Sequence, residues 1–297
     1  MRKFKLPFAV KKPILACGAD LKGAFAFAKG DEAIIADGFG DLANPDNLAR
    51  YEKAAKRYAA KAEIIACDLH PGYFSTRFAE SLKLKAYSLQ LCKIQHHEAH
   101  VVSAIVDNAV KGDVIGVAFD GTGFGLDKNI WGGEFFVGNP GNLKRAGHFE
   151  YVPMPGGEVA IREPWRMAVS YLYYAFGNKF LALKIDFLKK FRKRCQAPLI
   201  KIIEKGVNSP LTSSAGRLFD GVASLVMAKD TASYEAELPI ELQKLAFELC
   251  QDAYDFDIRT EKGMFVIGVA KIIKGVVKDL AGKSMNLYDN STTRLRY

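Results

Sequence analysis

The stretch VIGVAFDGTGFG at residues 114–125 joins an apolar strand pattern to a glycine-rich turn. Val114–Phe119 fits a buried strand, and Asp120 follows at its carboxyl end. Glycines let backbone N–H groups approach phosphate oxygens closely, and the Thr122 hydroxyl adds a further donor. We therefore predict a phosphate loop made of Asp120, Gly121, Thr122, Gly123 and Phe124, with an ordinary hairpin turn as the alternative.

The segments on both sides of this stretch follow a repeated order. Three short strand patterns, at residues 14–18, 24–28 and 33–37, precede alternating helical and strand segments. A similar order begins again at Val114, with strands expected at 130–137 and 144–152 and a helix at 162–176. A duplicated three-strand meander with crossover helices predicts an α/β, actin-like fold of two units facing a cleft.

The expected domains are a first lobe at 1–112, a second lobe at 113–285 and an irregular tail at 286–297. After residue 176 the patterns are mainly helical, including one over 264–280, and no later strand pair with a glycine turn is expected. We therefore expect the second lobe to be helix-rich and incomplete.

Composition narrows the class of protein. The chain has 297 residues, 49% of them hydrophobic and 25% charged, which is enough for a large core. No apolar run could span a bilayer and no secretory signal follows the basic N-terminus, so we expect a cytoplasmic protein without a membrane partner.

The five cysteines form no CxxC pair, and Cys17, Cys67 and Cys92 lie in apolar contexts typical of a core. A net charge of +9 could attract a nucleotide, an acyl phosphate, an RNA or an acidic partner surface, and charge alone does not choose among these. Set beside the repeat of two units facing a cleft, it favours a phosphate-bearing ligand in that cleft over nucleic acid.

The segment QHHEAH at residues 95–100 contains a candidate metal-binding pair. On a helix, His96 and His100 lie one turn apart on the same face, where two imidazoles can reach one metal ion. Asp120, at the end of the next strand, is the natural third ligand. The alternative is a helix start with solvated imidazoles.

Two further pairs are candidates for binding anions or a nucleotide. Arg162 and Arg166 are one turn apart on the expected helix and could clamp an anion, although a charged helix face is the simpler interpretation. Gly216 and Asp220 are also one turn apart, at a helix start. A carboxylate at that place can accept hydrogen bonds from ribose hydroxyls.

Six runs resemble, in order and spacing, the carbamoyltransferase domain of HypF hydrogenase maturation factors over residues 14–241. They are ILACGADLKGAFAFAKGD, CDLHPGYFSTRFAE, IQHHEAHVVSAIVDN, VIGVAFDGTGFGLDKNIWGGEFFVG, MPGGEVAIREPWRMAVSYL and SSAGRLFDGVASLV. That domain is itself similar to TsaD-type tRNA threonylcarbamoyltransferases and antibiotic O-carbamoyltransferases, all of the actin-like class.

The resemblance implies a set of roles for the residues singled out above. It implies an iron or zinc ion held by His96, His100 and Asp120, phosphate binding by the DGTG turn, and adenosine ribose near Gly216 and Asp220. Lys22, in the ADLK turn, is a weaker phosphate candidate. The implied reaction transfers a carbamoyl group from carbamoyl adenylate, made with ATP, to the C-terminal cysteine of a HypE-like partner during cyanide-ligand synthesis for nickel–iron hydrogenase. No nucleophile from this chain is required.

Three departures from the family pattern leave alternatives open. No YrdC-like module, which makes the adenylate, precedes Met1, so we expect it on another chain or missing. No LSGG or DGG segment follows Asp220, and the usual YEGQA reads YEAEL at 234–238. The alternatives are a truncated, non-catalytic paralogue that binds a nucleotide or a partner, and a carbamoyl-type transferase acting on tRNA or a small molecule.

Overall fold

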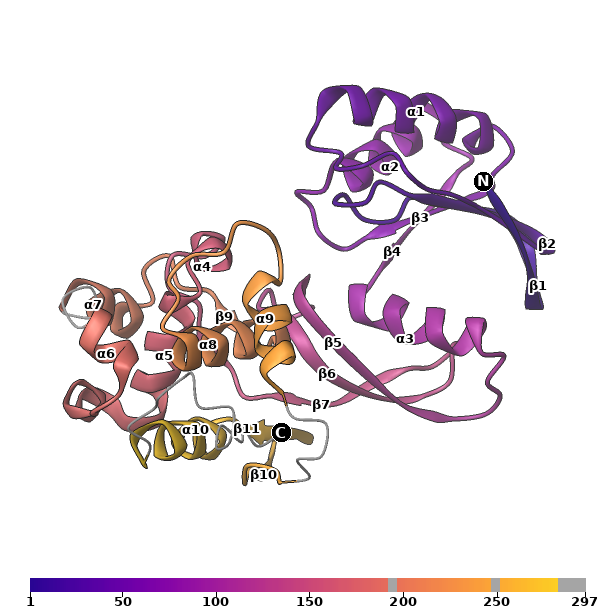
Figure 1. The fold of residues 1–297 in the computed structure, drawn as a ribbon. Helices are drawn as coiled ribbons and strands as arrows, with labels where there is room; N and C mark the ends of the chain where they lie inside the picture. Colours follow the sequence, from indigo (N-terminus) through magenta and orange to yellow (C-terminus); the bar gives the residue numbers. More distant parts are fainter. Residues whose placement is uncertain (192–196, 247–251, 283–297) are drawn as a thin grey trace. The chain divides into compact units, whose positions relative to one another are not determined.

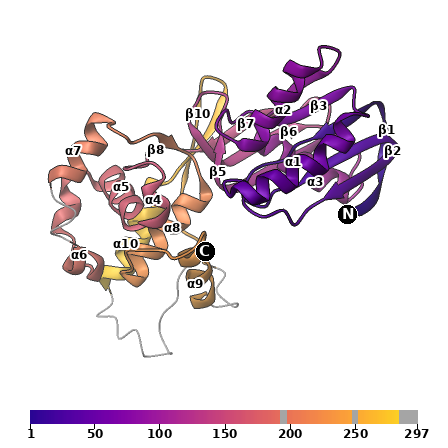
Figure 2. The same cartoon turned by 90° about the horizontal axis from the view of Figure 1, so that it is seen from above.

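The computed structural model describes residues 1–191, 197–246 and 252–282 (Figures 1 and 2). The chain forms two compact α/β units. The first comprises Met1–Asp113 with Phe124–Leu126, and the second comprises Val114–Gly123 and the chain from Asp127 onward. The expected tail at 286–297 lies outside the described residues.

The first unit is built on a four-stranded sheet in the order β2-β1-β3-β4. β1 and β2 are antiparallel, whereas β3 and β4 run parallel to β1. Helices α1 and α2 pack together over this sheet, and α3 leaves directly from the end of β4 (Figure 1). The elements are β1 (Arg2–Ala16), β2 (Phe25–Ala36), α1 (Pro45–Ala59), β3 (Ile64–Asp68), α2 (Phe74–Lys85), β4 (Gln90–Ile94) and α3 (His96–Asp107).

The core of the first unit lies between the sheet and α1 and α2. Tyr51 of α1 is fully buried among aromatic side chains that include Phe25 and Phe78, and its hydroxyl donates to the Cys17 carbonyl at 2.6 Å. Cys17 and Cys67 are buried, as expected for core residues, and Cys92 is half-buried. This core holds the carboxyl ends of β1 and β3 in place.

The three-strand meander expected in the first unit is wrong. Residues 24–28 and 33–37 do not form two strands, because they belong to the single strand β2, which pairs with β1 from Arg2 onward. Gly30, where a turn was expected, has φ +59° and lies opposite Val10 at a shift of register. A glycine in this conformation produces a β-bulge, so the strand bends and continues pairing.

The second unit contains a seven-stranded sheet in the order β10-β11-β7-β6-β9-β8, with β5 also paired to β6. The strands are β5 (Val114–Phe124), β6 (Ile130–Gly138), β7 (Lys144–Phe149), β8 (Val152–Pro153), β9 (Leu211–Thr212), β10 (Asp257–Glu261) and β11 (Met264–Gly268). The meander expected here, β5-β6-β7, is present. The last residue of β5, Phe124, groups with the first unit.

Helices α5, α8 and α10 pack against one another and form the main core of the second unit (Figure 2). The helices are α4 (Val159–Arg162), α5 (Trp165–Phe176), the 3-10 helix η1 (Gly177–Ala182), α6 (Asp186–Phe191), α7 (Ala197–Lys205), α8 (Ala215–Met227), α9 (Glu237–Leu245) and α10 (Ala270–Gly282). Among the described helices, none is long and apolar enough to cross a membrane.

Two sequence predictions for the second unit are wrong. A late strand pair does exist, because β10 and β11 form a hairpin whose turn residues, Lys262 and Gly263, both have positive φ. The short apolar run of β11 was assigned to a helix because it leads directly into the helical pattern of α10. The helix expected from Arg162 to Phe176 is two helices: α4 ends at Arg162 and α5 begins after Pro164, which disfavours helical backbone before it.

Candidate metal and nucleotide site

The start of α3 is fixed by the residue that follows β4. The Gln95 Oε1 atom accepts the backbone N–H of His97 at 2.6 Å and that of Glu98 at 3.0 Å, which caps the helix. The Gln95 Nε2 atom donates to the carbonyl of Phe124 at 3.1 Å. Gln95 therefore ties the histidine helix to the last residue of β5, within the first unit.

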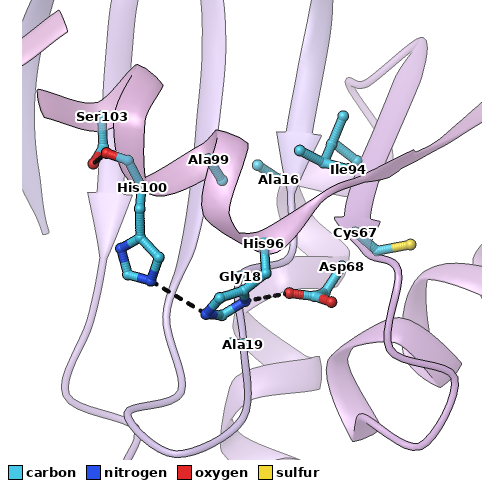
Figure 3. Close-up of a pocket in the computed structure, with 11 residues that line it drawn as sticks. Ala16, Gly18, Ala19, Cys67, Asp68, Ile94, His96, Ala99, His100 and Ser103 are labelled. Carbon is cyan, nitrogen blue, oxygen red and sulfur yellow. Dashed lines mark hydrogen bonds and ion pairs between the residues drawn. The ribbon is translucent and has the colours of Figure 1, made fainter. Parts of the chain in front are cut away.

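His96 and His100 face each other across one turn of α3 and line a pocket of the first unit (Figure 3). Their Nε2 atoms are 3.2 Å apart. Metal–nitrogen bonds of about 2.0–2.1 Å, at angles between about 90° and 109°, place two such atoms roughly 2.9–3.4 Å apart. The pair therefore fits two ligands of one divalent transition-metal ion. His97, between them in sequence, is fully buried and does not line the pocket.

Asp68 contacts the other side of the His96 ring. Its Oδ2 atom lies 2.6 Å from His96 Nδ1 (Figure 3). Its Oδ1 atom accepts the backbone N–H of His70 at 2.8 Å. Asp68 is not among the site residues predicted from the sequence. The sequence feature that marks Asp68 is its position at the carboxyl end of the apolar strand IIACD. The neighbouring strand β4 ends at Ile94, which pairs with Asp68.

The turn predicted at residues 120–124 is wrong: these residues continue strand β5, which pairs with β6, and the turn between the two strands lies at 126–127. In the second unit, Asp120 and Gly121 of β5 pack against the start of α8. The Ser214 hydroxyl lies 2.6 Å from the Asp120 carbonyl oxygen and 2.7 Å from that of Gly121. A Cβ atom on Gly216 would come within 2.7 Å of the Gly121 Cα atom. The Gly121 N–H is bonded to Asp120 Oδ1 at 2.7 Å. The fold thus brings together Asp120, Gly121 and Gly216, three residues that the sequence predicted for one nucleotide site.

Asp220 lies beneath this contact and is paired with Arg217. The Arg217 Nη1 atom is 2.6 Å from Asp220 Oδ2, and both side chains are almost fully buried. Burial raises the pKa of Asp220 to about 6, the positive charge of Arg217 opposes this shift, and Glu235 adds to it. Glu235 was not predicted from the sequence. It lies beside Gly121, because a Cβ atom built on Gly121 would be 3.7 Å from the Glu235 Oε1 atom. The sequence feature that marks Glu235 is the YEA run at residues 234–236.

A buried carboxylate holds the strand next to the glycine-rich end of β5. Glu134 Oε1 accepts the Ser213 hydroxyl at 2.6 Å and the N–H groups of Gly132 and Gly133, while Oε2 pairs with Arg145 Nε at 2.6 Å. The Arg145 guanidinium lies 3.7 Å from the centre of the Trp131 ring. Since Ser213 precedes the serine that contacts this end of β5, the cluster fixes the backbone on which it rests.

The remaining predicted residues lie apart from these contacts. Lys22 is exposed in the turn after β1 and does not line the histidine pocket. Arg162 is exposed at the end of α4, whereas Arg166 is in α5, with its Nε 2.6 Å from Glu163 Oε2. The two arginines therefore do not share one helix face, and their role in binding an anion stays a prediction.

The sheets with parallel crossover connections define a class of protein, the actin-like α/β fold. The comparisons confirm it: the chain superposes on a crystal structure of full-length HypF in the phosphate- and nucleotide-bound form with a TM-score of 0.83 and 31% identity. That superposition covers 95% of this chain and 36% of the other. HypF from T. kodakarensis superposes with a TM-score of 0.78 and 26% identity, over 95% of this chain and 38% of that one.

The chain belongs to the HypF family. Residues 9–107 match the HypF Kae1-like domain, and residues 116–292 match the second subdomain of the carbamoyltransferase, Kae1-like domain. It is 35% identical to carbamoyltransferase HypF2 of Cupriavidus necator over 78% of this chain and 29% of that protein. Identity to carbamoyltransferase HypF of Synechocystis is 30%, over 94% of this chain and 38% of that one. The chain therefore spans about a third of the length of these relatives.

Proposed function

We propose that this chain carries out the carbamoyl transfer step of HypF proteins. The donor is carbamoyl adenylate and the acceptor is the C-terminal cysteine thiol of a HypE-like protein. The thiol sulfur bonds to the carbonyl carbon, the bond from that carbon to the AMP phosphate oxygen breaks, AMP leaves, and the thiol proton passes to solvent. The observation that carries the proposal is the facing Nε2 pair of His96 and His100 in the family's domain.

The proposed metal ligands are His96 and His100 of the first unit and Asp120 of the second. Iron or zinc, when bound, supplies a positive charge that polarises the carbonyl group and neutralises phosphate. The chain's own residues orient the ligands: Gln95 fixes the helix start, and Ser214 holds the backbone of Asp120. The chain supplies no nucleophile in this scheme.

The proposed nucleotide contacts come from Asp120–Phe124, the glycine-rich end of β5, and from Gly216. The contact between Gly121 and Gly216 supports this assignment, because only hydrogen at both positions leaves the backbone close to a ligand. Asp220, Lys22, Arg162 and Arg166 stay as proposed contacts to ribose or phosphate. The adenylate comes from a YrdC-like module outside the described residues or on another protein.

The test reconstitutes transfer with the full chain. The chain is mixed with a YrdC-like domain, carbamoyl phosphate, ATP and a HypE-like acceptor. Intact-protein mass spectrometry then measures the mass added to the acceptor. We expect one added carbamoyl group with the wild-type chain and none with the double variant His96→Ala, His100→Ala. Ala104→Ser, a change at an exposed position of the same helix outside the pocket, is the matched control and should keep the transfer.

The same experiment separates the alternatives. A chain that binds ATP but modifies no acceptor, while an intact HypF protein does so in parallel, is the non-catalytic paralogue. Modification of tRNA or of a small-molecule acceptor, with HypE unmodified, is the other transferase. Either result would replace the proposed function.

A further inference from the structure

The contact between Asp68 and His96 joins two strand ends of one sheet. Asp68 is the last residue of β3, and His96 follows the end of the neighbouring strand β4. The Asp68 Oδ2 atom is 2.6 Å from His96 Nδ1, and the two side chains are only 8% and 17% exposed. Because an ionised carboxylate can only accept hydrogen bonds, the proton in this short, shielded contact lies on Nδ1, which donates to Asp68.

The Asp68 side chain is itself held in place. Its second oxygen, Oδ1, accepts the backbone N–H of His70 at 2.8 Å, and its carbonyl oxygen accepts the Thr76 hydroxyl at 3.2 Å. His70 is turned elsewhere, because its Nδ1 accepts the Gly72 N–H at 3.1 Å. Asp68 therefore cannot rotate away without breaking contacts to the loop that begins α2.

The proton on His96 Nδ1 decides what the opposite nitrogen can do. A neutral imidazole carries one proton, so that a proton on Nδ1 leaves a lone pair on Nε2. His96 Nε2 is the atom that faces His100 Nε2 at 3.2 Å (Figure 3). Carboxylates that accept the other N–H of a ligating histidine fix its tautomer and ring orientation.

We propose that Asp68 is a positioning residue that holds His96 in the tautomer with its lone pair on Nε2, the atom that binds the metal. This inference rests on the proposed function, because it assumes the metal at the histidine pair. Asn at position 68 cannot replace the carboxylate, since Asp68 uses both oxygens as acceptors and an amide has only one. In one orientation the amide NH₂ group would face the His70 N–H, and two donors cannot form a hydrogen bond. In the other orientation the NH₂ group would donate to His96 Nδ1, and the imidazole proton would then have to be on Nε2.

The test measures Co²⁺ binding to the full chain, by calorimetry and by the visible absorption of the bound ion. We expect Asp68→Asn to weaken Co²⁺ binding about 10–100-fold and to change the absorption spectrum. Glu80→Gln is the matched control: Glu80 is another carboxylate of this unit, in α2, and its partner is Lys93 at 2.8 Å. This control should bind Co²⁺ like the wild type.

A second measurement needs no variant at position 68. Long-range ¹H–¹⁵N spectra of the metal-free wild-type chain, with His96 assigned by its loss in His96→Ala, should show the proton on Nδ1. A proton on Nε2 overturns the inference. So does unchanged Co²⁺ affinity in Asp68→Asn when His96→Ala abolishes binding, and that result leaves the proposed function intact. Failure of the wild-type chain to bind Co²⁺ removes the proposed metal centre, and the inference with it.

Discussion

Gly216 packs directly on Gly121, so closely that a methyl group on the first would lie 2.7 Å from the Cα atom of the second. The Ser214 hydroxyl, two residues earlier, lies within hydrogen-bond distance of the carbonyl oxygens of Asp120 and Gly121. The start of α8 therefore shapes the glycine-rich end of strand β5. This part of the strand depends on a helix that comes much later in the chain.

The substitution Gly216→Ala should distort this part of β5. The added methyl group has to displace backbone, and overpacking of this kind costs about 1–3 kcal/mol of unfolding free energy. We expect a lower melting temperature and weaker ATP binding, measured by fluorescence and by calorimetry. Gly282→Ala is the control, because nothing lies near that glycine and its φ is not positive. Equal stability of the two variants would show that the contact is not tight.

Asp220 should make the second unit less stable as the pH rises from about 4 to 6. Its folded pKa, about 6, is above the ordinary value of 3.8, so that the folded state binds more protons in this range. The contribution is complete below about pH 4 and lost above about pH 6, and it amounts to about 3 kcal/mol at most.

Fluorescence of Trp131 and Trp165, the only tryptophans and both in the second unit, can follow unfolding in urea. The unfolding free energy of the wild type should fall relative to Asp220→Asn between pH 4 and 6. A difference between the two chains that does not change with pH would contradict the prediction.

Glu134→Gln should be strongly destabilising. The carboxylate is fully buried and pairs with Arg145, which is 10% exposed. The change leaves the buried guanidinium with only the more distant carboxylate of Asp127, at 3.8 Å, as its counter-charge. Breaking a buried pair costs about 3–5 kcal/mol. The control, Glu241→Gln, removes the partly exposed partner of Lys229 and should cost about 1 kcal/mol or less. Urea unfolding of both variants measures the difference, and similar losses would count against a special role for Glu134.

Gln95→Ala should loosen the histidine pair without removing a ligand. The change leaves the N–H groups of His97 and Glu98 uncapped and costs about 1 kcal/mol. We expect faster amide hydrogen exchange over residues 96–100 and weaker Co²⁺ binding. The control is Asn44→Ala, which removes the equivalent cap from α1 and should leave exchange in α3 unchanged. Slow exchange over 96–100 in Gln95→Ala would mean that packing alone holds the helix start.

Elements with local signals can be predicted from the sequence alone. The apolar runs of β3, β4 and β6, the Asn44 cap of α1, and the one-turn spacing of His96 and His100 all depend on residues close together in the chain. Local period and capping specify such features. Local patterns fail at Gly30, where pairing with β1 produces a bulge in place of the expected turn. They also fail at Met264–Gly268, where pairing with β7 produces a strand in place of the expected helix.

Only the tertiary structure decided which side chains meet. Asp68 reaches His96 because β3 and β4 are neighbours in register, and Gly216 reaches Gly121 because α8 starts beside the β5 strand. Arg217 and Asp220 are close in sequence, yet only burial made them a pair with a raised carboxyl pKa. Contacts of this kind depend on how strands pair and on which surfaces lose water, and neither is encoded in the spacing of residues along the chain.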